Sequence, residues 1–594
     1  MAKTKPAVVS KKKTAATTSD APPPPRKDGI RETVESVVIA FVLAFLFRAF
    51  EAEAFVIPTG SMAPTLMGVH KDLACEKCGI PYRISASEEQ DEAAESYRAA
   101  MKDGRRDARE RDNAARALAE RDVIAGVCPN CRYQMDIDPQ TAEGRKFPTY
   151  KGDRILVSKF PYDFADPQRW DVVVFKYPQT ANENYIKRCI GLPNETVVIY
   201  GGNIYTHDAD GQGREIKRKP PDKVRAIMQT VYDNDYTVAD LAAAGLSLRW
   251  NAMEPADTGS WQPLDGYLGY RTDGSSEAEA WLGYQHRLPS HLDWSEFTKT
   301  KRFVDDGTEI PPRLISDFYA YNAGSHRNYG AVPDGESQGL HWVGDLILEC
   351  DLTCEPAGSG KDAQAMLRLV RGGRTFDCLI DVTTGQARLA VNGEDMGAKA
   401  QTKVSPGTRH TLSFANVDAQ LILWVDGSLI EFDGPTTYEP LENDIPTIED
   451  LTPARIGSKG AGLQVEHLRL LRDVYYIATQ YVDSNAQIRM CDYKAPVAGF
   501  LAKPTSWPSV FASQRSVEFP LRSDEFLMLG DNSPRSADSR LWRGPDGRPE
   551  HYVKRDLLVG KAVFVYWPHS WNRIPGTRIP FPFFPNFARM KFVR

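Results

Sequence analysis

The 594-residue sequence predicts an α+β protein that is mostly β, with an N-terminal transmembrane helix, a β-rich core and an inserted antiparallel β-sandwich. Three observations lead to this fold class. An apolar run follows a basic tail near the N-terminus, β-branched runs bounded by Pro, Gly and Asp fill 150–205, and strand patterns separated by turn signals fill 340–475. A net charge of -6 over this length argues against a dedicated nucleic-acid binder.

The N-terminal region combines a basic tail with an apolar segment. Residues 1–28 are rich in Lys, Arg, Pro and Ala, and we expect a disordered cytoplasmic tail. Residues 29–52 contain an uncharged apolar run, 37–47, which is shorter than the roughly 20 residues of a full span. A cleaved signal peptide is one alternative, although no small-residue cleavage site follows. A buried core helix fits the length but not the basic tail.

We therefore expect an uncleaved, single-pass anchor in the cell inner (cytoplasmic) membrane. The basic flank stays in the cytoplasm, which places the rest of the chain on the outer, periplasmic side.

The pattern along the chain divides it into eight segments. They are a tail (1–28), an anchor (29–52), a first core part (53–74), an insertion with paired cysteines and a helical hairpin or single long helix (75–145), a second core part (146–215), a mixed insertion (216–335), a β-sandwich insertion (336–475) and a third core part (476–594).

Two CxxC pairs bound the first insertion. Their cysteines are Cys75, Cys78, Cys128 and Cys131. Each pair presents two thiolates on one turn, which suits a tetrahedral zinc site of the zinc-ribbon kind. Disulfides are the alternative, because the segment is expected to face an oxidising compartment. A structural zinc ion is thus the favoured cofactor, and none is expected for catalysis.

Three separate segments carry residues suited to nucleophilic chemistry. The first, TGSMAPT at 59–65, is a tight turn that can expose the hydroxyl of Ser61. In the second, YIKRCIGLP at 185–193, Lys187 lies in an apolar strand pattern. Burial lowers the pKa of a lysine, and a neutral lysine can accept a serine proton. The third, LGDNSPRSADSR at 529–540, suits a shaped loop beside a site. Taken singly, the serine turn is more typical of a plain loop, Lys187 equally suits a solvated lysine, and Asp538 and Arg540 could form a structural ion pair.

Together the segments resemble bacterial type I signal peptidases. An anchor is followed in order by TGSMAPTL, GDRILVSK, KRCIGLPNE and GDNSPRSADSR, and chance agreement of five ordered motifs is negligible. The resemblance implies a membrane-bound serine endopeptidase that cleaves signal peptides from exported preproteins through an acyl-enzyme. Its partners would be preprotein signal peptides and membrane lipid, with no nucleic acid.

The resemblance also implies the roles of the site residues. Ser61 would be the nucleophile and Lys187 the general base of a Ser-Lys dyad, with the Ser61 N–H and the Thr59 hydroxyl as oxyanion donors. The supporting residues would be Ser536, which orients Lys187, Asp538 and Arg540, which brace the loop, and Asp531 and Met62.

Two departures from the family pattern stand out. The family's Gly-Asp after Leu-Pro is Asn194-Glu195 here, and Asn tolerates the left-handed backbone that such a turn needs. Ser61 and Lys187 are also far apart in sequence, which the 75–145 insertion explains.

The 336–475 segment resembles laminin-G or concanavalin-like domains, most clearly at 409–434. A glycan or protein ligand is one reading of this insertion and an inert insert is the other. Two alternative functions for the whole chain are a self-cleaving SOS-type repressor and a surface glycan-binding protein with an inactive protease core. Cleavage of a preprotein would discriminate among them.

Overall fold

The computed structural model describes residues 33–42, 52–103, 107–208, 213–253, 261–275, 278–303, 309–327, 339–355, 363–441, 444–480, 491–494, 499–544, 546–573 and 579–594. The expected tail (1–28) lies outside these residues, as do 29–32 and 43–51 of the expected anchor. Residues 33–42 are helical. Among the helices that the structure describes, none is both long and apolar enough to span a bilayer. The anchor therefore stays a prediction.

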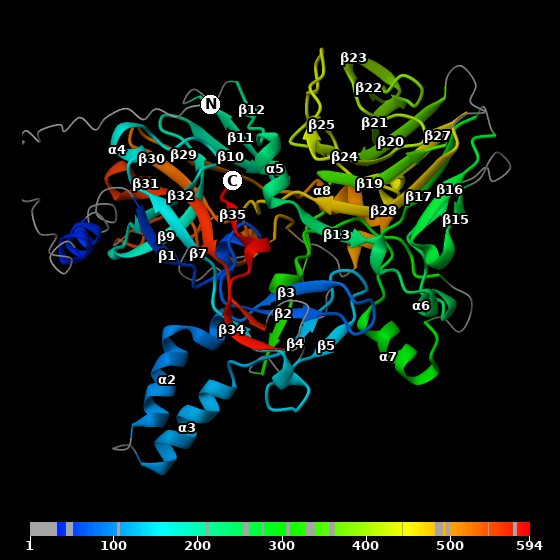
Figure 1. Cartoon of the computed structure of the whole chain (residues 1–594). Coiled ribbons are helices and arrows are strands. Elements are labelled where there is room, and N and C mark those ends of the chain that lie inside the picture. Colours follow the sequence, from blue (N-terminus) through cyan, green and yellow to red (C-terminus); the bar gives the residue numbers. More distant parts are fainter. Residues whose placement is uncertain are drawn as a thin grey trace, which may run out of the picture. The chain divides into compact units, whose positions relative to one another are not determined.

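Two sheets form a β-rich core from three separate parts of the sequence (Figure 1). The first sheet has the order β1 (Ala52–Val56), β7 (Arg154–Ser158), β32 (Leu558–Trp567), β8 (Val172–Tyr177), β9 (Thr180–Gly191), β30 (Glu525–Leu529) and β31 (Val553–Lys554), with β35 (Lys591–Phe592) paired to β32. The second has the order β12 (Glu215–Ile216), β11 (Asn203–His207), β10 (Thr196–Tyr200) and β29 (Ser516–Pro520). The expected mostly-β core is thus confirmed.

Two larger sheets pack face to face as a β-sandwich. One has the order β15 (Gln262–Pro263), β16 (Gly269–Thr272), β28 (Leu463–Arg472), β19 (Leu346–Cys354), β24 (Arg409–Val417), β25 (Gln420–Val425) and β26 (Ser428–Leu429), with β13 (Gln229–Asp233) paired to β28. The other has the order β14 (Trp250–Ala252), β17 (Ala280–Tyr284), β27 (Ala454–Lys459), β20 (Gln364–Arg371), β21 (Arg374–Asp381), β22 (Gln386–Val391) and β23 (Glu394–Gln401). Leu348 and Phe414 of the first sheet share one buried cluster with Leu367 and Phe376 of the second.

The sandwich takes in more of the chain than the expected 336–475. Strands β13 to β17, within 229–284, come from the segment that was expected to be a separate mixed insertion, and they pair with β28 and β27. These strands are only two to five residues long. Such short runs carry little periodic signal, which is why the sequence pattern did not separate them from loops.

The cysteine-bounded insertion contributes strands to two small sheets, which other segments complete, and contains a helical hairpin. The sheets are β3 (Pro81–Ser85), β2 (His70–Ala74) and β6 (Thr149–Tyr150), and β18 (Gly324–His326), β4 (Val123–Val127) and β5 (Gln134–Asp136). The hairpin is α2 (Glu92–Lys102) and α3 (Ala108–Ala119), which extends away from the strands in Figure 1. Asp91 and Asp107 cap the two helices by accepting backbone hydrogen bonds. The other helices are α4 (Pro161–Phe164), α5 (Pro221–Ile227), α6 (Ala239–Ala243), α7 (His291–Thr300) and α8 (Trp507–Phe511), and a short β-hairpin joins β33 (Trp571–Arg573) to β34 (Pro580–Phe584).

A buried ion-pair cluster ties the core to the sandwich. Lys219, just after β12, lies 2.8 Å from both Asp418 Oδ1 and Asp473 Oδ2, and all three side chains are at most 2% exposed. Asp418 follows β24 and Asp473 follows β28. Separating these charges would leave the two carboxylates buried without a cation. The cluster therefore fixes the β-rich core against the sandwich.

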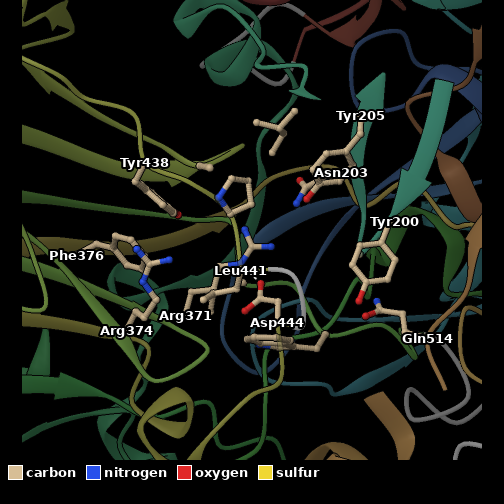
Figure 2. Close-up of a pocket in the computed structure, with 16 residues that line it drawn as sticks. Tyr200, Asn203, Tyr205, Arg371, Arg374, Phe376, Tyr438, Leu441, Asp444 and Gln514 are labelled. Atoms are coloured by element: carbon tan, nitrogen blue, oxygen red, sulfur yellow. Dashed lines mark hydrogen bonds and ion pairs between the residues drawn. The ribbon is translucent and has the colours of Figure 1, made fainter. Parts of the chain in front are cut away.

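The seam beside this cluster is polar and tightly packed. Figure 2 shows Tyr200, Asn203 and Tyr205 from β10 and β11 facing Arg371 and Tyr438 of the sandwich. The cavity between them measures about 30 Å³, and a water needs at least about 10–15 Å³. The seam therefore has room for one or two waters and not for a sugar ring.

Candidate active site

The turn that carries Ser61 is held by two contacts, one through Met62 and one between Gly60 and Tyr321. Residues Gly60–Met62 form one turn of 3-10 helix after β1, and Ser61 is 8% exposed. Met62 is fully buried in the cluster beneath β7 and β8. A Cβ atom at Gly60 would lie 2.2 Å from the ring of Tyr321. Only glycine therefore fits before Ser61.

Lys187 on β9 reaches the nucleophile directly. Its Nζ atom lies 2.8 Å from Ser61 Oγ and donates to the Ile186 carbonyl at 3.0 Å. The side chain is 4% exposed. Burial lowers the pKa of Lys187 to about 8, although the nearby carboxylates of Asp538 and Asp531 oppose the shift. About one lysine in ten is then neutral at pH 7 and able to accept a proton.

The loop at 529–540 is braced by a buried ion pair. Asp538 Oδ1 and Oδ2 accept from the Arg540 guanidinium at 2.8 Å, and both side chains are fully buried. Asp538 also accepts from Gly530 N at 3.0 Å, and Arg540 donates to Ser533 Oγ at 2.7 Å. These contacts give the loop a fixed shape beside the dyad.

Two expected site residues make no contact that tests their roles. Ser536 is 3% exposed, and its Oγ atom has no hydrogen-bond partner among the described residues. Thr59 is exposed in extended backbone and its side chain caps no turn there. The orienting role of Ser536 and the oxyanion role of Thr59 remain predictions.

A second buried ion pair joins the base-bearing strand to the loop. The Arg188 guanidinium donates twice to Asp531, at 2.7 Å from Nε to Oδ1 and 2.7 Å from Nη2 to Oδ2, with both side chains at most 1% exposed. Thr65, four residues after the nucleophile, donates to the same carboxylate. Sequence reasoning had Asp531 as a supporting residue but missed Arg188 and Thr65, because an arginine beside a catalytic lysine is equally typical of a solvated surface.

An asparagine pair links the inserted region to the nucleophile turn. Asn532 donates from its backbone to Ser61 O and from its side chain to Gly60 O, each at 3.0 Å. The amide of Asn322, just before β18, exchanges reciprocal hydrogen bonds of 2.7 and 2.8 Å with the amide of Asn532. Asn322 belongs to the mixed insertion, and no local motif marks it.

We expect Asn322→Ala to lower kcat on a preprotein about fivefold with little change in KM, because the net worth of one buried hydrogen bond is about 1 kcal/mol. Asn532 would lose its side-chain partner and hold Gly60 less firmly. Steady-state kinetics would measure this. The exposed Asn251→Ala in the same insertion is the matched control, and an unchanged kcat in folded Asn322→Ala would show that the pair does not position Ser61.

The turn at Asn194-Glu195 keeps its shape despite the departure from the family pattern. Asn194 adopts a left-handed backbone with φ 66°, as expected. Glu195 accepts from Leu192 N at 2.7 Å and pairs with Arg169 at 2.6 Å. Glu195, one methylene longer than the Asp of the family pattern, thus closes the turn after β9 by bonding to Leu192 N.

The four cysteines converge as a tetrad. The Sγ atoms of Cys75 and Cys131, and those of Cys78 and Cys128, lie 3.6 Å apart, and all four ligand atoms lie within 4.8 Å of one another. A disulfide needs about 2.0 Å, whereas tetrahedral zinc with bonds of about 2.3 Å places sulfurs about 3.8 Å apart.

Two arginines lie beside the tetrad. Arg249 is 5% exposed and donates to the Asn130 carbonyl, between the two cysteines of the second pair. Arg132 directly follows that pair and stacks on the Phe318 ring, 3.4 Å from its centroid. Two guanidinium groups beside four thiolates suit a zinc–tetrathiolate centre, whose net charge is negative.

Comparison with known families finds one family model that matches two stretches of the chain. The family described as signal peptidase, peptidase S26, matches residues 144–244 and 473–567. These stretches contain Lys187, Asp531 and Asp538, while Ser61 lies outside them.

Among curated proteins, signal peptidase I of Pseudomonas aeruginosa is 46% identical over 71 residues, covering 10% of this chain and 25% of that protein. Signal peptidase I of Leptolyngbya laminosa is 38% identical over 87 residues, covering 12% and 42%. The chain thus spans less than half the length of these relatives.

Solved structures match at low similarity. The carbohydrate-binding module CBM66 from Bacillus subtilis has a TM-score of 0.19 at 10% identity, covering 38% of this chain and 91% of that chain. The Caenorhabditis elegans galectin LEC-6 has a TM-score of 0.16 at 12% identity, covering 21% and 83%. At these scores the likeness supports no argument. By sequence, the regions around Lys187 and the 529–540 loop are similar to signal peptidases of the S26 family.

Proposed function

We propose that this chain is a type I signal peptidase, a membrane-bound serine endopeptidase with a Ser61–Lys187 dyad. The observation that carries the proposal is the 2.8 Å approach of Lys187 Nζ to Ser61 Oγ, with the lysine buried. The S26 match over 144–244 and 473–567 supports the same reaction class.

In the proposed reaction the neutral amine of Lys187 accepts the proton of Ser61 as Oγ attacks the scissile carbonyl carbon. The oxyanion that forms is held by the Ser61 N–H and the Thr59 hydroxyl. The C–N bond then breaks as the Lys187 ammonium returns a proton to the leaving amine. Water hydrolyses the resulting ester, with Lys187 again as base, and Ser61 is released.

We propose exported preproteins with small residues before the cut as substrates. The N-terminal anchor would hold the enzyme in the cell inner membrane, with the catalytic domain on the periplasmic side and lipid as a partner. The likeness of the sandwich to laminin-G or concanavalin-like domains, and a glycan or protein ligand for it, are part of this proposal.

Cleavage of a purified preprotein in detergent tests the function. The wild-type chain should release the mature protein, and Ser61→Ala should lose this activity while keeping its thermal unfolding transition. Ser96→Ala, at an exposed serine on α2, is the control and should cleave normally. Cleavage by Ser61→Ala at a rate near wild type would exclude Ser61 as nucleophile.

We also propose a structural zinc ion at the cysteine tetrad, supported by the sulfur spacing. Purified protein should contain zinc that Cys128→Ser loses, since three thiolates no longer complete the tetrahedron. Cys378→Ser, at a buried cysteine of the sandwich, should keep it. Elemental analysis with thiol titration makes the measurement, and four oxidised thiols without zinc would assign disulfides instead.

A further inference from the structure

A second group of side chains of the kinds that bind metals lies next to the nucleophile segment. His70 and Asp72 occupy alternate positions of β2 and so point to one face of the strand. His569 follows β32 from the distant C-terminal part of the core. One ligand atom from each of the three residues lies within 4.8 Å of the other two.

His70 presents an unpaired nitrogen to this group. Its Nδ1 atom lies 2.7 Å from the Gly68 carbonyl, which can only accept, so Nδ1 carries the proton and Nε2 carries a lone pair. The residue is fully buried, and Nε2 has no hydrogen-bond partner in the described part of the chain.

The geometry around Asp72 suits a cation between its carboxylate and the Nε2 atoms of His70 and His569. His70 Nε2 faces Asp72 Oδ1 at 3.6 Å, and His569 Nε2 lies 3.0 Å from Asp72 Oδ2. A neutral imidazole nitrogen and a carboxylate oxygen that face each other repel unless a proton or a metal lies between them. The His70 backbone hydrogen bond is also the kind of outer contact that orients metal-ligating histidines.

Two arginines at the rim compete with a bound cation. Arg589 donates from Nη1 to His569 Nδ1 at 2.7 Å, so without metal His569 Nε2 holds the proton and donates to Asp72. Arg589 Nη2 also lies 3.8 Å from Asp153 Oδ1, which accepts no hydrogen bond in the described residues. Arg589 can therefore turn to Asp153 and free His569. Arg83 pairs with Asp72 Oδ1 at 2.9 Å on the other flank.

We propose that His70 Nε2, Asp72 and His569 Nε2 form a binding site for a divalent transition-metal cation of the zinc class, separate from the cysteine tetrad. Two imidazoles and one carboxylate are a common zinc ligand set, and three protein ligands leave an open coordination position. The metal would join β2, which follows the nucleophile turn, to the chain after β32.

Zinc titration of the purified full-length chain tests the site. Wild type should bind a zinc ion that Asp72→Asn and His569→Ala bind at least tenfold more weakly. Arg589→Gln should bind it several-fold more tightly, because the competing cation is gone. Isothermal calorimetry with Zn²⁺ gives the affinities, and Co²⁺ spectra distinguish this site from a thiolate site, which alone shows strong sulfur charge-transfer bands.

The controls separate metal binding from folding. Asp72→Asn is nearly isosteric at a partly exposed position, and its thermal unfolding without metal should match wild type. His467→Ala removes a surface histidine that also pairs with an aspartate, Asp235, and should leave zinc binding unchanged. Zinc affinities of Asp72→Asn and His569→Ala equal to that of wild type would overturn the proposal.

Discussion

Lys187→Arg is expected to lower kcat/KM on a preprotein by about 10²–10⁴-fold, the usual range for loss of a general base. Arginine keeps the charge and approximate length but does not deprotonate in proteins, so it cannot accept the Ser61 proton. Lys187→Ala should be equally inactive. Lys176→Arg, at an exposed lysine on the neighbouring strand β8, should cleave at the wild-type rate.

The pH profile carries the same prediction for the wild type. Because only the neutral amine is active and burial lowers the pKa of Lys187 to about 8, activity should rise about tenfold per pH unit below pH 7 and level off above pH 9. Initial rates in overlapping buffers measure it. Substantial activity in Lys187→Arg, or a pH profile of activity that is flat from pH 6 to 9, would show that Lys187 is not the general base and only contributes a positive charge.

Asp531→Asn is expected to lower the free energy of unfolding by about 3–5 kcal/mol, because it leaves the Arg188 guanidinium buried without a counter-charge. Both residues are at most 1% exposed and share two hydrogen bonds of 2.7 Å. Activity should fall as well, since Asn532, the next residue, donates hydrogen bonds to the carbonyl oxygens of Gly60 and Ser61. Urea unfolding followed by tryptophan fluorescence measures the loss.

A matched pair on the surface provides the control. Asp546 and Arg548 are 60% and 86% exposed and lie 3.6 Å apart. Solvent screens such a pair, so Asp546→Asn should change the unfolding free energy by less than about 1 kcal/mol. Equal effects of the two substitutions would mean that Arg188 finds another partner or water when Asp531 is neutralised.

The sequence was most informative where chemistry is local. The serine turn, the lysine strand and the aspartate loop are each a short motif, and the structure brings Ser61 and Lys187 to 2.8 Å. The paired cysteines are also a local motif, because each CxxC pair places two metal ligands within four residues of sequence. Asn194 is similar, since it stands where the family pattern has Gly and Asn tolerates the left-handed backbone of such a turn.

Contacts between distant segments that no motif marks were beyond reach of the sequence. Nothing near Asn322 or Asn532 marks them as partners, because each is an ordinary polar residue until the fold pairs them. The short strands within 229–284 were missed for a related reason: their pairing to β27 and β28 is set by the surrounding sheet and not by their own periodicity. A deletion of 336–475 would consequently leave these strands without partners.

The bond between Asn532 and the Gly60 carbonyl joins positions 472 residues apart in the chain. At synthesis rates of about 5–20 residues per second, roughly half a minute to a minute and a half passes between translation of the two. Until then the backbone around Ser61 lacks this contact, and Arg188 and Thr65 lack the Asp531 carboxylate to which both donate. For most of its synthesis, a nascent chain would therefore carry Ser61 without the contacts that shape the proposed catalytic centre.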